Sequence, residues 1–222
     1  MKHGVYVREQ KTSVSTPVVA ESGVPFVVGA APVHSAESPA ALFTPVLCTD
    51  WEDAVKKLGY SDDWKTYTIC EVMYSHFKLF QRQPIIFCNV LDPSTNKEAV
   101  AGAEVTLSGK QAKLPFDAIL SSLVVKAASS SESALVKDTD YAAYYSDGNL
   151  IVETIEDGAA KAATKLFISY DKIKTADIDD DDIVKGIEAI DLCMATVSTT
   201  PDLIIAPGWS HTSTVQAVMA AK

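Results

Sequence analysis

The sequence predicts an α/β fold: an open α/β core that carries an inserted, mostly β domain and an extended N-terminal arm. Short apolar runs bounded by Pro or Gly, the pattern of buried strands, occur at residues 25–30, 85–90 and 202–206, and helical patterns separate them. Between the second and third runs, residues 94–176 contain short strand-like runs and a tight-turn signal instead. The third observation is an isolated strand-like segment near the start of the chain.

These changes in the pattern of predicted strands and helices set the expected domain boundaries. We expect an arm and linker over residues 1–22, a discontinuous α/β core formed by residues 23–93 and 177–222, and an inserted β-rich domain over residues 94–176. The alternation of helices and strands stops inside its own pattern at Lys222. We therefore expect the core to be incomplete at the C-terminus and the chain to be the N-terminal portion of a longer protein.

The first half of the core contains two predicted helices. Thr49 and Glu52 have the spacing of a capping box, and Gly59 is a C-terminal stop signal, so one helix should end at Leu58. A second helix is expected over residues 64–81. Its apolar face would consist of Ile69, Val72, Met73, His76, Phe77 and Phe80.

Further elements follow in the second half of the chain. Asp147-Gly148 predicts a β-hairpin, because both residues tolerate the positive φ angles of a tight turn. Residues 123–126 and 166–170 indicate short strands, and a last helix should start near Thr212 after the turn at residues 207–210. The acidic residues 179–182 should open a helix. Its apolar face would consist of Ile183, Val184, Ile187, Ile190 and Met194.

Composition excludes several classes of function. The formal net charge is −10, which argues against a broad cationic surface for nucleic acid. No apolar run approaches the ~18 residues of a membrane span, and charges near the start argue against a signal peptide, so we expect a cytosolic protein. The scattered cysteines are expected to be buried apolar residues; they are Cys48, Cys70, Cys88 and Cys193.

One acidic run has some of the features of a metal site. Asp177, Asp179, Asp181 and Glu188 fall at positions one, three, five and twelve of an EF-hand calcium loop. However, Asp182 stands at the sixth position, where the sharp loop needs Gly. An acidic helix N-terminus on a solvated surface explains the run better, and we expect no metal ligands.

The second chemical candidate is the segment around Ser210. It follows a predicted strand and precedes a helix, as a hydrolase nucleophile does, but the final Gly of that motif is missing and His211 is directly adjacent. Ser210 is better explained as a helix cap. The other histidines (His3, His34 and His76) show no ligand spacing. We expect no catalytic, cofactor-binding or metal-binding residues; an enzyme would instead need a polar pocket near Gly29 or Gly208.

Four stretches together resemble the tail-sheath proteins of contractile phage tails. Residues 4–9 (GVYVRE) resemble the N-terminal arm of that family, and residues 23–32 (GVPFVVGAAP) its first core strand and turn. Residues 183–190 (IVKGIEAI) resemble its Gly-Ile-Glu-Ala helix, and residues 201–210 (PDLIIAPGWS) its most specific strand and loop. Their order and spacing also agree, including a β insertion between the core blocks.

The resemblance implies a structural protein and not an enzyme. Such a subunit polymerises into a helical tube around an inner tail tube and contracts to drive that tube through a target envelope. The implied partners are other copies of the chain, the inner tail tube protein, and baseplate and tail terminator proteins, with no cofactor, nucleic acid or membrane. Assembly would take place in the bacterial cytoplasm and end in a virion tail or a phage-tail-like particle.

The arm residues Gly4, Val5, Tyr6, Val7 and Arg8 are expected to mediate assembly by adding a strand to another subunit. A strand this short and isolated needs a sheet elsewhere to join. Two alternatives stay open: a sheath from a bacteriocin-like or secretion-type particle, and, more distantly, a hydrolase-like enzyme on the α/β core.

Overall fold

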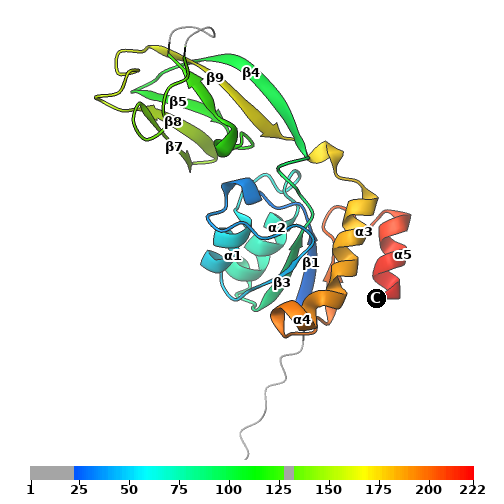
Figure 1. Ribbon diagram of the computed structural model, residues 1–222. Coiled ribbons are helices and arrows are strands. Elements are labelled where there is room, and N and C mark those ends of the chain that lie inside the picture. Colours follow the sequence, from blue (N-terminus) through cyan, green and yellow to red (C-terminus); the bar gives the residue numbers. More distant parts are fainter. Residues whose placement is uncertain (1–22, 128–132) are drawn as a thin grey trace, which may run out of the picture.

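The computed structural model describes residues 23–127 and 133–222, which form an α/β part and a β part (Figure 1). The α/β part contains a four-stranded open sheet with the strand order β10-β1-β3-β2. Helices α3 and α5 lie on one side of it and α1 and α2 on the other (Figure 1). The mixed open sheet agrees with the predicted α/β fold class. No helix of the described residues is long and apolar enough to cross a membrane.

The centre of this sheet consists of two completely buried strands. All residues of β1 (Pro25–Gly29) and β3 (Ile85–Asn89) are buried, as expected for parallel strands that are covered on both faces. β10 (Leu203–Ile205) is parallel to β1, and β2 (Pro45–Cys48) is antiparallel to β3. The prediction of a buried strand at 202–206 was wrong in one respect, because β10 is an edge strand and Leu203 is 55% exposed.

Helix α1 (Trp51–Leu58) ends as predicted but is capped one residue later. Asp50, and not Thr49, is the N-cap: its carboxylate accepts a hydrogen bond of 2.8 Å from the Asp53 N–H. At the other end Gly59 has a φ of 72°, and its N–H donates to the Val55 carbonyl. Both Asp and Thr can cap a helix, so the sequence pattern alone did not decide between them.

The second predicted helix is shorter and changes its pitch. It comprises α2 (Ile69–Met73) and the π-helical turn η2 (Tyr74–Leu79), so it begins five residues later than expected. Most of its predicted apolar face is buried, but Phe80 is 69% exposed. The N–H of Phe80 donates to the Ser75 carbonyl, five residues back, and this wider turn rotates Phe80 away from the face.

The helix after the β part starts as predicted. α3 (Asp180–Glu188) begins with a reciprocal capping box between Asp179 and Asp182, so the acidic run forms the first turn of a helix. The 3₁₀ turn η5 (Ala189–Leu192) then breaks the α-helical period before α4 (Cys193–Val197), which explains why Met194 is 61% exposed.

The last helix starts close to the predicted position. It is α5 (Ser213–Ala221), and its N-cap residue is Thr212. Ser210 lies in the preceding turn, so its predicted role as a helix cap was wrong.

Two three-stranded antiparallel sheets enclose the core of the β part. One has the order β4 (Lys97–Thr106), β9 (Lys165–Ile173), β6 (Val124–Lys126); the other has β5 (Gln111–Pro115), β8 (Asn149–Thr154), β7 (Tyr141–Ser146). A hydrophobic cluster that includes Leu150 and Ile168 is buried here. The predicted hairpin is confirmed: Asp147 and Gly148 connect β7 to β8 with φ angles of 49° and 69°. Short 3₁₀ turns complete the described chain; they are η1 (Val33–Ser35), η3 (Leu120–Ser122) and η4 (Thr175–Asp177).

All four cysteines are buried and free, as the sequence predicted. Burial raises the pKa of the Cys48, Cys70 and Cys88 thiols to about 12. The thiols are therefore protonated at neutral pH and act as small apolar groups.

Gly186 allows α3 to lie directly against the central strands. A Cβ at this position would come closer than van der Waals contact to the side chains of Val28 in β1 and of Val90 after β3. Both valines are buried and β-branched, so they have little room to rotate away. The close approach of helix and sheet therefore depends on the absence of a side chain.

We predict that Gly186→Ala destabilises the protein. Alanine gains about 1 kcal/mol of helix propensity, but the overpacking costs about 1–3 kcal/mol, so the free energy of unfolding should fall by about 1 kcal/mol in a urea titration. Glu188→Ala, at an exposed position of the same helix, is the control and should change it by less than about 0.5 kcal/mol. Equal or greater stability of Gly186→Ala would contradict the packing argument.

Candidate functional site: the sheet edges and the junction between the two parts

The predicted assembly residues, Gly4, Val5, Tyr6, Val7 and Arg8, lie outside the described residues. The structure does define the position at which the described chain begins. The N–H groups of Gly23 and Val24 donate to the Asp202 carboxylate at 2.8 and 3.2 Å, and the Asp202 N–H donates to the Val24 carbonyl at 2.9 Å. The chain therefore enters β1 beside the first residues of the edge strand β10.

One edge of the sheet is protected against further strand pairing. β2 begins with Pro45, which has no N–H to donate, and the Lys57 ammonium donates to the Leu47 carbonyl at 3.0 Å. Asp53 holds this lysine in place with an ion pair of 2.7 Å. Prolines and lysines on edge strands are common means of preventing unwanted pairing.

The opposite edge, at β10, is open and apolar. Asp202 directs its N–H toward β1, and successive N–H groups of a strand point in opposite directions, so the Leu203 N–H points away from β1. Within the described residues, no strand pairs with this side of β10. Leu203 is exposed, and Ile204 and Ile205 are half-buried. This edge combines a free backbone donor with an apolar surface, which is what an added strand requires.

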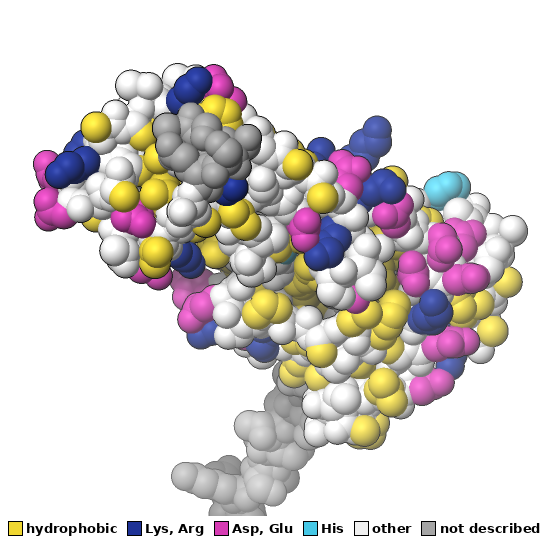
Figure 2. All heavy atoms as spheres, turned by 45° about the horizontal axis from the view of Figure 1, so that its top comes forward, with side chains coloured by type: hydrophobic (Ala, Val, Ile, Leu, Met, Phe, Trp, Pro, Cys, Tyr) yellow, Lys and Arg dark blue, Asp and Glu magenta, His cyan; other side chains and the backbone are white. Residues whose placement is uncertain are grey.

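Other exposed apolar side chains lie at the end of the sheet where β3 and β10 begin. Leu79 and Phe80 precede β3, and Leu192 and Met194 lie in η5 and α4, shortly before β10. Figure 2 shows hydrophobic side chains gathered on the face of the α/β part that is turned to the viewer. Exposed apolar surface of this kind is typical of contact regions.

A hollow of about 440 Å³ occurs near Gly208, where an enzyme of this fold class would have its pocket. Its charged lining residues, Lys65 and Glu71, are exposed to solvent, and no Ser, His or Cys lines it. Ser210 and His211 are exposed and lie outside the lining. Among the described residues, no three His, Cys, Asp or Glu side chains gather in a group that could hold a metal ion.

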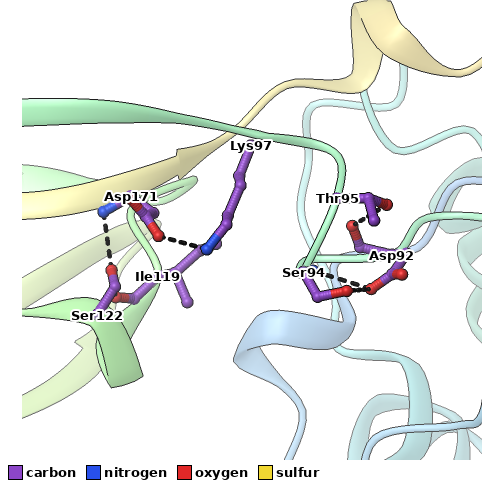
Figure 3. Close-up of polar contacts among 7 residues, drawn as sticks. All are labelled: Asp92, Ser94, Thr95, Lys97, Ile119, Ser122 and Asp171. Carbon is purple, nitrogen blue, oxygen red and sulfur yellow. Dashed lines mark hydrogen bonds and ion pairs between the residues drawn. The ribbon is translucent and has the colours of Figure 1, made fainter.

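A polar turn connects the α/β part to the β part (Figure 3). The Asp92 carboxylate accepts hydrogen bonds from the N–H and hydroxyl of Ser94 at 2.8 and 2.7 Å, and these bonds lower the pKa of Asp92. The Asn96 amide oxygen accepts from the Asp92 N–H, and the Asn96 carbonyl accepts from the N–H of Lys174 at 2.9 Å. Because Lys174 belongs to the returning segment, this last bond ties the two crossings together.

The beginning of β4 is fixed to β9 close by. Lys97 forms an ion pair of 2.7 Å with Asp171, whose N–H donates to the Ser122 hydroxyl at 2.8 Å (Figure 3). A hollow of about 490 Å³ lies beside these residues, and residues of both parts line it. No periodic pattern in the sequence identified this junction, because its residues come from turns that are far apart along the chain.

The comparisons with known proteins give one relevant match. No family model and no curated protein matches this sequence. A solved structure that matches is the crystal structure of the sheath tail protein Lin1278 from Listeria innocua. It is 14% identical, with a TM-score of 0.40, and the match covers 90% of this chain and 44% of that chain. This chain therefore spans less than half the length of that protein.

We predict that Asp92→Ala loosens the junction. Loss of the two bonds to Ser94 should lower the free energy of local opening by about 1 kcal/mol, so trypsin should cleave after Lys97 about fivefold faster in limited proteolysis. Asp157→Ala, at an exposed position of the β part, should leave the rate unchanged.

The same contact should depend on pH. Folding lowers the pKa of Asp92. The contribution of Asp92 to the stability of the junction is therefore fully present above the unfolded pKa of about 3.9, and it is lost as the pH falls through the lower pKa of the folded state. Unchanged cleavage of Asp92→Ala at pH 7 would contradict the assignment.

Proposed function

We propose that this chain is part of a structural subunit of a contractile tail sheath. The complete subunit polymerises into a helical tube around an inner tail tube and contracts to drive that tube through a target envelope. The four sequence stretches that resemble the sheath family support this proposal. The structural observation that best supports the proposal is the difference between the two edges of the α/β sheet. The β2 edge is protected, whereas the apolar β10 edge can accept a strand.

Strand addition is a suitable physical basis for such an assembly. An extended segment that joins the sheet of another subunit forms directional main-chain hydrogen bonds, each worth about 0.5–1.5 kcal/mol net. A joint with several such bonds is stable, and a head-to-tail contact that does not close on itself generates a helical array. In this proposal Gly4, Val5, Tyr6, Val7 and Arg8 form the donated strand.

The proposed partners are further copies of the chain, the inner tail tube protein, and the baseplate and tail terminator proteins. Assembly occurs in the bacterial cytoplasm, and the product is a virion tail or a phage-tail-like particle. New contacts between subunits, and not nucleotide hydrolysis, supply the work of contraction. A bacteriocin-like or secretion-type sheath would have the same physical basis.

A hydrolase-like alternative would use Ser210 as its nucleophile, although this residue is exposed and does not line the hollow near Gly208. Turnover of an ester or amide substrate that is lost in Ser210→Ala would favour that alternative. The same result would contradict the proposed structural role.

We predict that the complete subunit without residues 4–8 stays folded but monomeric. The deletion removes the donated strand and leaves the buried core untouched, so circular dichroism should be unchanged while negative-stain micrographs show no tubes. A deletion of equal length within the linker, residues 10–14, serves as the control and should still give tubes. Normal sheaths after deletion of residues 4–8 would contradict the proposal.

We also predict that Leu203→Pro prevents a strand from joining the β10 edge. Proline removes the N–H that points away from β1, whereas the Asp202 N–H that bonds to Val24 stays in place. The control Leu203→Ala removes the apolar side chain and keeps the N–H. In the complete subunit, Leu203→Pro should reduce the fraction in tubes, measured by sedimentation, at least tenfold more than Leu203→Ala. Equal effects would show that the backbone of this edge forms no joint.

A further inference from the structure

An aromatic cluster joins the α/β part to the β part. His34 and Tyr67 belong to the α/β part, and Phe116 and Tyr145 belong to the β part. The ring of His34 lies 5.9 Å from that of Tyr67, 5.4 Å from that of Phe116 and 5.8 Å from that of Tyr145, between ring centroids. His34 contacts all three other rings and is therefore the centre of the cluster.

A hydrogen bond also crosses the junction at His34. Its Nε2 lies 3.0 Å from the Phe116 carbonyl oxygen, which can only accept, so Nε2 carries the proton and donates. The ring contacts and this bond depend on the same side chain. A change in the charge of His34 therefore acts directly on the contact between the two parts.

The surroundings of His34 disfavour a positive charge. The nearby Asp117 carboxylate is paired with Lys172 at 3.6 Å. Asp92, which lines a hollow of about 310 Å³ together with His34, accepts its hydrogen bonds within the junction turn. Burial, partly offset by the bond to the Phe116 carbonyl, lowers the pKa of His34 from 6.5 to about 4.

The two tyrosines of the cluster stay neutral in the pH range in which His34 titrates. Burial raises the pKa of Tyr145 to about 12 and that of Tyr67 well above its usual range. The cluster therefore offers no negative charge that would stabilise a protonated His34.

We propose that His34 is an acid-sensitive latch between the α/β part and the β part. At neutral pH the uncharged ring fills the aromatic cluster and donates to Phe116. In acid, Nδ1 takes up a proton more readily when the junction is open, because water then solvates the charge. Acid therefore shifts the equilibrium toward a state in which the β part is released. This inference is independent of the proposed sheath function, because both parts belong to one chain.

The two pKa values of His34 set the pH window of the latch. The ring has its ordinary pKa of 6.5 in the open junction and a pKa of about 4 in the closed one. The closed state is therefore fully favoured above pH 6.5 and weakens as the pH falls from 6.5 to 4. Between pH 7 and pH 5 the ratio of open to closed molecules should rise about 20-fold. The effect of Asp92 begins only at lower pH, so the two contributions are separable.

Limited proteolysis of the full chain at pH 7 and pH 5 tests the latch. Proteinase K is active at both pH values and should cut the connecting residues 92–97 and 173–178 in the open state, and mass spectrometry identifies these cuts. The variant His34→Phe keeps an aromatic ring but cannot take up a proton. From pH 7 to pH 5, the cleavage rate of the parent chain should rise about 20-fold more than that of His34→Phe. Comparison at equal pH removes the pH dependence of the protease itself.

The matched control is His76→Phe, which replaces a histidine of η2 outside the cluster. This variant should show the same rise in cleavage as the parent chain. The proposal is overturned if the parent chain shows no greater rise than His34→Phe.

A second measurement follows the ring itself and needs no variant. In NMR spectra of the folded chain, the His34 ring should titrate with a midpoint near 4, and in the urea-unfolded chain near 6.5. A midpoint at the ordinary value in the folded chain would also overturn the proposal, even if His34→Phe fails to fold.

Discussion

The parallel pairing of β1 with strands on both of its sides is the constraint on which the rest of the structure depends. Parallel strands cannot be joined by a tight turn, so the connection from β3 to β10, which both run parallel to β1, must cross from one end of the sheet to the other. The connection from β3 to β10 is long enough to contain the whole β part as well as α3. Both faces of β1 are covered, and Gly186 brings α3 into direct contact with it.

Much of this core could be predicted from sequence because its signals are local. The Pro- and Gly-bounded runs of β1 and β3, the stop at Gly59 and the turn at Asp147-Gly148 each depend on a few neighbouring residues. The edge strand β2 and the mostly exposed strand β4 were not predicted, because neither shows regular alternation of buried and exposed residues. Phe80 and Met194 were misplaced because a π turn and a 3₁₀ turn shift the helical period.

The candidate site was less accessible to such reasoning. The predicted arm lies outside the described residues, and which sheet edge is open depends on long-range contacts such as that of Lys57 with Leu47. The aromatic contact between the two parts was not predicted at all. His34 of the α/β part contacts the rings of Phe116 and Tyr145 of the β part, which are far away along the chain, and only folding brings them together. For His34, the lack of ligand spacing in the sequence said nothing about its role between the two parts.

The protected edge at β2 limits the number of edges from which the sheet can grow. A sheet with two free margins can grow in both directions, which is the geometry of fibrils and other unlimited side-by-side stacks. Here Pro45 and Lys57 protect the β2 edge, so the α/β sheet can extend only from β10. When two such sheets pair directly through their β10 edges, a protected β2 edge lies at each outer side, so the pairing stops at two sheets.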